Sequence, residues 1–526
     1  MPKADLLLTH GRVLTCDPAR PAASAVAILG DRILWVGEAQ EGKDTFAAAR
    51  VIDCQGKTIL PGFIDAHMHL FAYAANLQGV DCSPRAVRSI GQIQEAIRRR
   101  AATFPPGSWI RAWGFEEFHL DEGRPPTRWE LDAAAPRHPV KLAHRSGHAS
   151  VLNSLALAML GVTNETPEPE GSIIGRDAAT GELTGHLLEM EQILAERGAP
   201  GLSQAEIETA LEAAQRQLFS FGVTSIHEAT PTRALEQWEH LQRLRERGRF
   251  LLRAYKMFGP ADIAQLQERG LSFGSGDARL SVGAIKFMLN ETGEGVLPPQ
   301  DVLNEQVYAA HNAGFQAAFH AAEELGALAA VAAVEIAIRR SAEEATDISS
   351  TGMRVHDHRH RIEHCGICPP ALAARLARAG MLVVTQPAFI AEHGERYLAH
   401  IPPADLEWLY PVKRLQEARV RLAFGSDCPV VSPEPLRGIA AAVTRRAGNG
   451  KVVGAKEAIS TQEAIAAYTR GGAYASIDEV LKGTIAPDML ADMVVLSEDI
   501  SQTPVERLGE VKAEKTILGG QTVWER

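Results

Sequence analysis

Two histidines one residue apart, His67 and His69, follow the apolar run at residues 61–64. In a β-strand, side chains at positions i and i+2 point to the same side. Two imidazoles that leave one strand on the same side can bind a divalent ion such as Zn²⁺ when other segments supply further ligands. Alone, the pair could equally be two histidines on the protein surface, so the interpretation as a metal site depends on the rest of the chain.

Four later apolar runs end in side chains that can take part in a metal site. The runs 282–286, 315–320, 361–364 and 421–427 end in Lys286, His320, His364 and Asp427. Each run is typical of a buried strand that finishes at its polar residue. The sequence therefore offers six candidate ligands when His67 and His69 are included.

The order of the elements indicates how these ligands could meet. Eight strand candidates lie near residues 64–70, 223–228, 251–258, 282–289, 315–320, 360–364, 381–386 and 421–427. Helix-like stretches follow most of them, which predicts an α/β fold of the (β/α)₈ barrel type. Catalytic groups of such barrels gather at the carboxyl ends of the strands, where all six candidates fall.

The remaining chain predicts two additions to the barrel. Short strand-like runs at 1–61 and 483–526 predict one small discontinuous β-sandwich built from both ends of the chain. The barrel then occupies 62–482, and residues 76–215 are far too many for an ordinary loop. We expect an inserted subdomain there that caps the active site.

Composition narrows the class of partner. The 526 residues include 45% hydrophobic residues and carry a formal charge of −11, from 65 acidic and 54 basic residues. Without a basic block we expect no binding to nucleic acid or to an anionic membrane, and a small-molecule substrate instead. No long apolar run predicts a signal peptide or a membrane span. Six scattered cysteines do not predict a disulfide framework, and we expect a cytoplasmic protein.

Cys365 and Cys368 form the one Cys-x-x-Cys of the chain, directly after His364. No second pair completes a zinc knuckle, so we interpret both as packing at the barrel rim, with redox chemistry as the alternative. The tract at 356–360, which contains His358 and His360, precedes a strand. We therefore expect it at the opposite end of the barrel.

Several motifs occur together in one order along the chain. They are residues 61–69, 146–154, 283–286, 360–364, 425–427, 483–488 and 491–496. In this combination the chain resembles the amidohydrolase superfamily, and within it the YtcJ-like group, also called amidohydrolase family 3. The resemblance covers nearly the whole sequence.

The resemblance implies a ligand set. His67 and His69 would bind the more buried ion together with Asp427, and His320 and His364 would bind the second. Lys286 would be carboxylated by CO₂ and bridge two ions, expected to be Zn²⁺. A carbamate converts a buried cation into an anionic oxygen ligand. Many relatives continue with Asp-Gly after this lysine, whereas this chain has Phe287 to Asn290, so a site with one metal and an ordinary lysine paired with a carboxylate both stay open.

The expected mechanism uses a metal-activated water that attacks a carbonyl carbon. Asp427 would accept the water proton and return it to the leaving nitrogen. Its alternative role is that of a helix N-cap. His148, within the Gly-His pair of the resembling family, would bind the substrate or polarise its carbonyl, and we predict Trp113 and Asn290 as further substrate contacts.

We therefore predict a hydrolase of a non-peptide carbon–nitrogen bond in an amide, an N-formyl or N-acyl amine, or a cyclic amide. Deformylation of N-substituted formamides is the nearest activity in the resembling family. A mononuclear deaminase, for which Glu323 or Glu324 could serve as the acid, is one alternative, and an ester or lactone hydrolase is another. A metal-free binding protein on the same scaffold is the non-enzymatic alternative. A homodimer is a family-level expectation.

Overall fold

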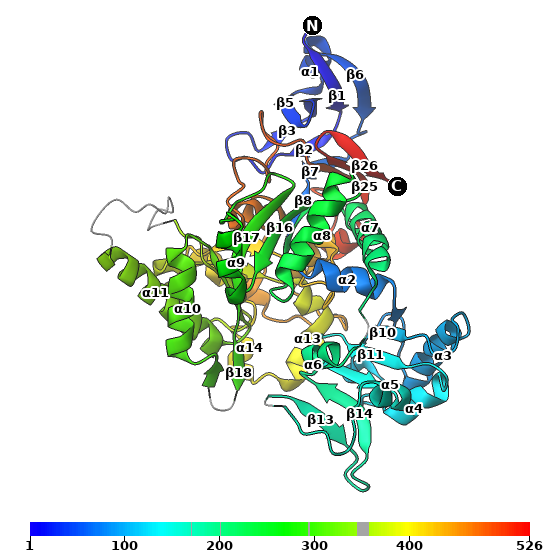
Figure 1. The fold of residues 1–526 in the computed structure, drawn as a ribbon. Coiled ribbons are helices and arrows are strands. Elements are labelled where there is room, and N and C mark those ends of the chain that lie inside the picture. The colour runs from blue at the N-terminus through cyan, green and yellow to red at the C-terminus, as the bar shows by residue number, and fades with distance from the viewer. Residues whose placement is uncertain (170, 200, 293–294, 345–356) are drawn as a thin grey trace. The chain divides into compact units, whose positions relative to one another are not determined.

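The computed structural model describes residues 1–169, 171–199, 201–292, 295–344 and 357–526, so His356 lies outside the described residues. The unit made of Met1–His69 and Gln215–Arg526 contains an eight-stranded parallel sheet in the order β23-β22-β21-β20-β17-β16-β15-β8. Strands β8, β16 and β17 of this sheet are labelled in Figure 1. The strands are β8 (Phe63–Met68), β15 (Val223–Glu228), β16 (Arg253–Phe258), β17 (Leu280–Met288), β20 (Ala317–Ala321), β21 (Arg361–His364), β22 (Leu382–Thr385) and β23 (Arg421–Phe424). The (β/α)₈ prediction is confirmed, and the observed strands match the eight predicted runs in order.

The two outer strands of this sheet, β8 and β23, meet beyond their ends. The Asp427 N–H donates to the His67 carbonyl at 2.7 Å, and the His69 N–H donates to the Cys428 carbonyl at 2.7 Å. These bonds bring the first and last strands together at their carboxyl ends. The barrel is therefore nearly closed where the candidate ligands lie.

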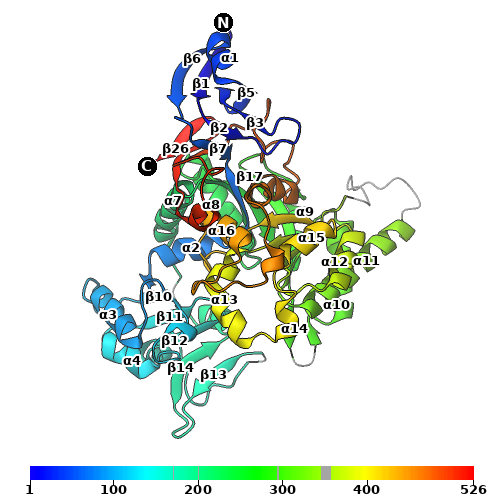
Figure 2. The same cartoon turned by 180° about the vertical axis from the view of Figure 1, so that it is seen from behind.

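Helices between the strands bury one face each against the barrel. They include α8 (Ala234–Glu246), α10 (Gln300–Asn312), α11 (Glu324–Glu344), α12 (Pro370–Arg378), α13 (Ala388–His400) and α16 (Pro435–Thr444). In α10 the buried residues Leu303, Val307 and Ala310 recur at helical spacing, which is why this segment forms an amphipathic helix. Helix α11 packs against α10 on one side and against α12 on the other, so the three helices lie side by side in sequence order (Figure 2).

Strands from both ends of the chain share one sheet beside the barrel. Its order is β26-β25-β24-β7-β2-β3, from β2 (Arg12–Leu14), β3 (Ala22–Ala23), β7 (Thr58–Pro61), β24 (Met493–Leu496), β25 (Ala513–Leu518) and β26 (Gln521–Glu525). A second sheet, β5-β4-β1-β6, is built from β1 (Lys3–Thr9), β4 (Ala25–Leu29), β5 (Arg32–Gly37) and β6 (Ala47–Asp53). Ile28, Ile59 and Met493 belong to one apolar core that joins the two sheets.

Residues Leu70–Ala214 form a compact unit of their own. A six-stranded sheet, β13-β14-β12-β11-β10-β9, makes its centre. Its strands are β9 (Val80–Asp81), β10 (Ile110–Phe115), β11 (Val140–His144), β12 (Ala149–Leu152), β13 (Ile173–Arg176) and β14 (Leu183–Leu188). Helices α3 (Ile90–Ala101) and α4 (Arg128–Ala134) contribute Ile93, Ile97 and Leu131 to the apolar core of this unit.

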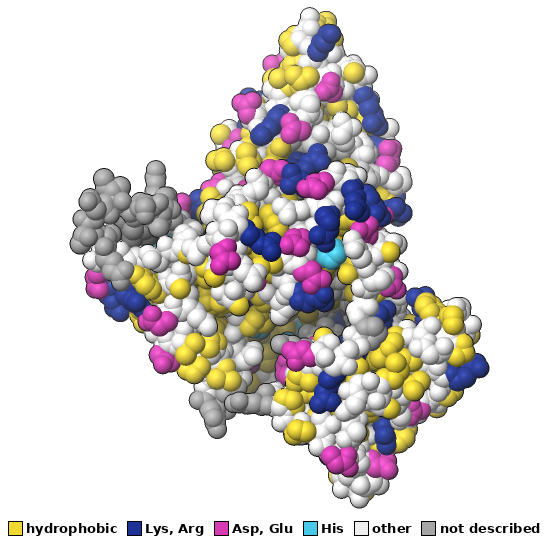
Figure 3. All heavy atoms as spheres, in the orientation of Figure 1, with side chains coloured by type: hydrophobic (Ala, Val, Ile, Leu, Met, Phe, Trp, Pro, Cys, Tyr) yellow, Lys and Arg dark blue, Asp and Glu magenta, His cyan; other side chains and the backbone are white. Residues whose placement is uncertain are grey.

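The helices and the surface charges bear on possible contact with a membrane or with nucleic acid. None of the helices in the described parts of the chain combines the length and the apolar character that crossing a membrane requires. On the face drawn in Figure 3, Lys and Arg side chains lie intermixed with Asp and Glu side chains.

Candidate metal centre

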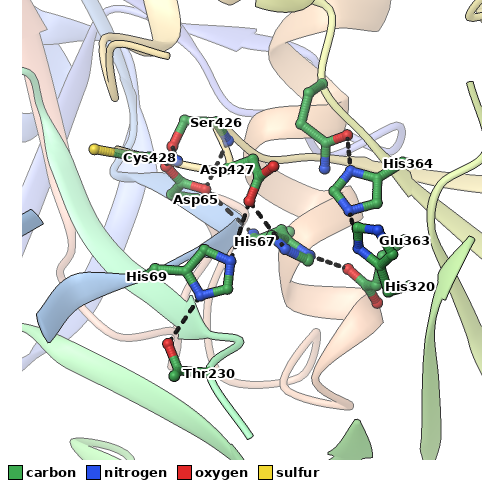
Figure 4. A network of polar contacts seen from close by, with 12 residues as sticks. Asp65, His67, His69, Thr230, His320, Glu363, His364, Ser426, Asp427 and Cys428 are labelled. Carbon is green, nitrogen blue, oxygen red and sulfur yellow. Dashed lines mark hydrogen bonds and ion pairs between the residues drawn. The ribbon is translucent and has the colours of Figure 1, made fainter. Parts of the chain in front are cut away.

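Three of the predicted ligands converge at the carboxyl end of the barrel (Figure 4). The Nε2 atom of His67 lies 3.3 Å from Oδ1 of Asp427, and Nε2 of His69 lies 3.2 Å from the same oxygen. One potential ligand atom from each of the three side chains falls within 4.8 Å of the others. Two nitrogens and a carboxylate oxygen in this arrangement form a suitable donor set for Zn²⁺.

Hydrogen bonds at the opposite ring nitrogens set the direction of these two imidazoles. His67 Nδ1 is bonded to a carboxylate oxygen of Glu363, and His69 Nδ1 donates to the Thr230 hydroxyl at 2.8 Å. The Thr230 hydroxyl in turn donates to Glu228 at 2.6 Å. Because Nδ1 makes these outer bonds, Nε2 is the nitrogen that each ring turns toward Asp427 and that would bind a metal, which is the usual support of a metal-binding histidine.

A second pair of predicted ligands lies beside the first group. His364 Nε2 and His320 Nδ1 are 2.9 Å apart, and the rings of His364 and His67 have centroids 5.0 Å apart. Gln386 Oε1 accepts a hydrogen bond from His364 Nδ1 at 2.9 Å. Burial lowers the pKa of His364 to about 4, so its imidazole is neutral, as a metal ligand must be.

His364 and Asp427 reach the site because the backbone turns where their strands end. His364 has φ 75° and Asp427 has φ 58°, both in the left-handed region that side chains other than glycine seldom adopt. A regular continuation of β21 would point His364 to the face opposite Glu363. The turn brings His364 into the site instead, and strain of this kind is typical of functional positions.

Lys286 on β17 is the sixth predicted ligand. Its side chain is only 1% exposed, and among the described residues its Nζ atom has no hydrogen-bond partner. Burial lowers the pKa of Lys286 to about 8, against the opposing charges of Glu363 and Asp427. This environment disagrees with an ordinary lysine paired with a carboxylate and fits an amine that is available for modification.

Two buried carboxylates provide the negative charge of the site. Burial opposes ionisation of Glu363, but the Arg361 guanidinium and His67 hold its pKa well below the usual range. Burial likewise opposes ionisation of Asp427, and bonds from His67 and His69 hold its pKa well below the usual range. Both groups are therefore anionic at neutral pH.

These observations fit a bound divalent metal. The imidazole nitrogens and the Asp427 carboxylate converge, and the outer nitrogens of His67 and His69 are supported. Nearby, the buried Lys286 amine has no hydrogen-bond partner within the part of the chain that the structure describes. His67, His69 and Asp427 would hold one ion, and His320 with His364 could hold another. Lys286 lies close enough to Glu363 and Asp427 to respond to their charges.

Sequence patterns did not identify the residues that support the ligands. Glu363 belongs to the 360–364 motif, yet nothing in the spacing assigned it a partner. Thr230 and Gln386 follow the ends of β15 and β22, and this position at a strand end is the one sequence feature that could have indicated a place near the site. Asp65 accepts hydrogen bonds from the Ser426 N–H at 2.9 Å and from the His67 N–H at 3.2 Å, and so ties β8 to the segment after β23.

The predicted substrate contacts lie in different places. His148 is about half exposed and pairs with Glu189, at 2.8 Å between Nδ1 and Oε1. Trp113 is half-buried on β10. Both belong to the unit Leu70–Ala214, whereas the six predicted metal ligands belong to the other unit. Asn290 is exposed in the short strand β18 (Asn290–Thr292), just after β17. All three stay predictions.

Two further predictions concern residues near the barrel. His358 and His360 lie at the amino end of the barrel, where His360 Nδ1 accepts a hydrogen bond from the N–H of Ala317, the first residue of β20. Cys365 and Cys368 are both buried and free. Neither the two histidines nor the two cysteines belong to the group of His67, His69 and Asp427.

Comparison with known proteins gives consistent matches. A family model described as "Amidohydrolase family" matches residues 50–524. N-substituted formamide deformylase from Arthrobacter pascens is 29% identical over 99% of this chain and 98% of the relative. The putative amidohydrolase YtcJ of Bacillus subtilis (strain 168) is 28% identical over 90% of each chain. In fold, the chain is similar to an uncharacterized metal-dependent hydrolase from Pyrococcus horikoshii OT3, with a TM-score of 0.73, 22% identity, and coverage of 95% of this chain and 99% of that one.

Proposed function

The chain belongs to the amidohydrolase family, and from this premise we propose that it is a metal-dependent hydrolase that cleaves a non-peptide carbon–nitrogen bond. The observation that carries the proposal is the convergence of His67, His69 and Asp427 at the carboxyl end of the barrel. Barrel enzymes place their chemistry at this end. The similarity to a formamide deformylase over nearly the full length of both chains supports the bond type.

We further propose that the site holds a pair of Zn²⁺ ions bridged by a carbamate on Lys286. The first ion would be held by His67, His69 and Asp427, and the second by His320 and His364. The Nζ atom of Lys286, which is buried and has no hydrogen-bond partner in the described ranges, supports the carbamate, because the uncharged form of such an amine reacts with CO₂. When bound, the metal supplies a water of lowered pKa and a positive charge for the carbonyl oxygen.

Asp427 is the proposed proton carrier. Its Oδ1 lies between Nε2 of His67 and Nε2 of His69, so it borders the place where water and substrate would meet. A carboxylate there can accept a proton from the attacking water and pass it to the leaving nitrogen. This transfer turns a poor amide leaving group into a neutral amine.

The proposed substrates are amides, N-formyl or N-acyl amines, and cyclic amides. His148 would polarise the carbonyl, Trp113 and Asn290 would contact the substrate, and the insertion 76–215 would cap the site. The other proposed boundaries are 1–61 and 483–526 for the β-sandwich and 62–482 for the barrel. A cytoplasmic location and a homodimer stay predictions from the sequence.

A product assay tests the proposal. The purified protein, loaded with Zn²⁺, is offered N-substituted formamides, N-acyl amines and cyclic amides, with matched esters, lactones and aminopurines as controls. We expect release of a carboxylate and an amine, and a loss of about 10²–10⁴-fold in kcat for Asp427→Asn at equal metal content. Ammonia from an aminopurine would indicate the deaminase instead, and turnover of esters or lactones alone would indicate the other hydrolase.

A further inference from the structure

We infer, on the basis of the proposed function, that Glu363 positions His67 and, together with Arg361, sets how tightly the chain holds the ion at His67, His69 and Asp427. Glu363 is fully buried and its carboxylate is bonded to Nδ1 of His67. That bond fixes the ring so that Nε2 faces Asp427. A carboxylate on the outer nitrogen also makes an imidazole a stronger metal ligand.

Arg361 holds Glu363 in place. Its guanidinium binds Glu363 at two points, with Nε 2.5 Å from Oε1 and Nη2 3.0 Å from Oε2. Both side chains are fully buried. A paired geometry of this kind is the strong form of an arginine–carboxylate contact and leaves the carboxylate little freedom to turn.

The same guanidinium also reaches the backbone that carries His67. Arg361 Nη2 donates to the Ala66 carbonyl at 2.6 Å, one residue before the ligand. Arg361 Nη1 lies 2.9 Å from His227 Nδ1 on β15. Arg361 therefore supports the His67 backbone directly and the His67 ring through Glu363, from a strand that is not a neighbour of β8 in the sheet.

Strand β21 joins the two proposed ion sites. Arg361 and Glu363 are two residues apart and point to the same face of the strand, while the left-handed turn at His364 brings the next residue into the second site. One strand thus carries a ligand of one ion and the support for a ligand of the other. A change at Glu363 is expected to weaken mainly the binding of the ion held by His67, His69 and Asp427.

Two of the other three ligand imidazoles, those of His69 and His364, have neutral supports. His69 Nδ1 contacts the Thr230 hydroxyl, and His364 Nδ1 contacts the Gln386 amide oxygen. Glu228 behind Thr230 is itself paired with the buried Lys256. A charged support directly on the ring distinguishes His67 from both, which makes Thr230 a matched control.

The test measures Zn²⁺ affinity by competition with a chelating dye. Glu363→Gln keeps the size and an acceptor oxygen but removes the charge, and we expect Zn²⁺ to bind about 10–100-fold more weakly. Thr230→Val removes a neutral acceptor from His69 and is expected to cost several-fold less. Cobalt-loaded Glu363→Gln should also show a changed visible absorption spectrum, because the ligand geometry changes.

Glu363→Gln alone leaves the buried Arg361 charge without its partner and could prevent folding. The double variant Glu363→Gln/Arg361→Met removes both charges together, and we expect it to show the same weakened affinity. Wild-type affinity in the double variant, or equal losses for Thr230→Val and Glu363→Gln, would overturn the inference. A wild-type protein that binds no Zn²⁺ would instead overturn the proposed function.

Discussion

At the scale of single residues, Lys286 carries the most information about the site. An amine that is 1% exposed and has no hydrogen-bond partner among the described residues is costly to keep charged. Conversion to a carbamate would replace this unpaired amine with an anionic ligand between two cations. The same burial that makes the lysine unfavourable as a cation therefore favours its proposed role.

Three other histidines form a buried chain at the amino end of the barrel. His360 Nδ1 accepts from the Ala317 N–H, so its Nε2 donates to His311 Nδ1 at 2.9 Å. The His360 N–H donates to His358 Nδ1, and His358 Nε2 donates to the Ala379 carbonyl. Each ring has a fixed tautomer, and none can take a second proton without losing a bond.

This chain predicts a loss of stability in mild acid. Burial lowers the pKa of all three histidines, that of His358 to about 4, whereas an unfolded histidine has a pKa near 6.5. Above about pH 6.5 both states are neutral, and below it only the unfolded chain takes up the proton. For His358, the free energy of unfolding should therefore fall by up to about 1.4 kcal/mol per pH unit as the pH drops from about 6.5 toward 4, and His311 and His360 should act in the same direction.

Urea unfolding between pH 7 and pH 4.5 measures the effect. His358→Asn keeps an acceptor for the His360 N–H but does not titrate, so its free energy of unfolding should fall less steeply than that of the wild type. Parallel curves for the two proteins would show that His358 does not contribute.

Residue types and spacing predicted the six candidate ligands but not their supports. His67 and His364 stand out because each ends a buried run. Glu363, Thr230 and Gln386 matter through hydrogen bonds to residues far away in sequence, which alternation along one strand cannot indicate. The left-handed backbone at His364 and Asp427 is also not encoded by a local signal such as glycine.

At the scale of elements, the strands and their order were predictable because parallel barrel strands are buried on both faces and appear as short apolar runs. The ends were less predictable. Strand β8 stops at Met68 and β23 stops at Phe424, so His69 and Asp427 lie beyond regular strand geometry. Tertiary hydrogen bonds between these two segments, rather than strand pairing, determine where they sit.

Gly425 tests how β8 and β23 are joined. A Cβ atom at this position would lie 2.5 Å from the His67 backbone N and 2.8 Å from its Cβ. Gly425→Ala should push the two strands apart, with a cost of about 1–3 kcal/mol in the free energy of unfolding and weaker Zn²⁺ binding.

Gly91→Ala is the matched control for this substitution. Its new Cβ would have Ser89 Oγ at 3.8 Å as its nearest neighbour, and alanine is favoured in helix α3. We expect no loss of stability or affinity there. Unchanged Zn²⁺ binding in Gly425→Ala would mean that the contact between the strands does not position His67.

At the scale of the whole molecule, the chain divides into two compact units, one from Met1–His69 and Gln215–Arg526 and one from Leu70–Ala214. The six candidate ligands all belong to the first unit, and two of the three predicted substrate contacts belong to the second. Metal binding and the predicted substrate contacts can therefore be tested separately. Changes at His148 or Trp113 should leave the metal content intact, whereas changes among the ligands should not.

We propose that a metal site built around Lys286 performs the chemistry. Elemental analysis of the protein grown with added zinc, beside Lys286→Met, tests it most directly. We expect two Zn²⁺ ions per wild-type chain and one or none in Lys286→Met, because the substitution removes the bridging ligand. One ion that is unaffected by the substitution would contradict the bridged pair, and a wild-type chain without bound metal would show that the chain is not a metal-dependent hydrolase.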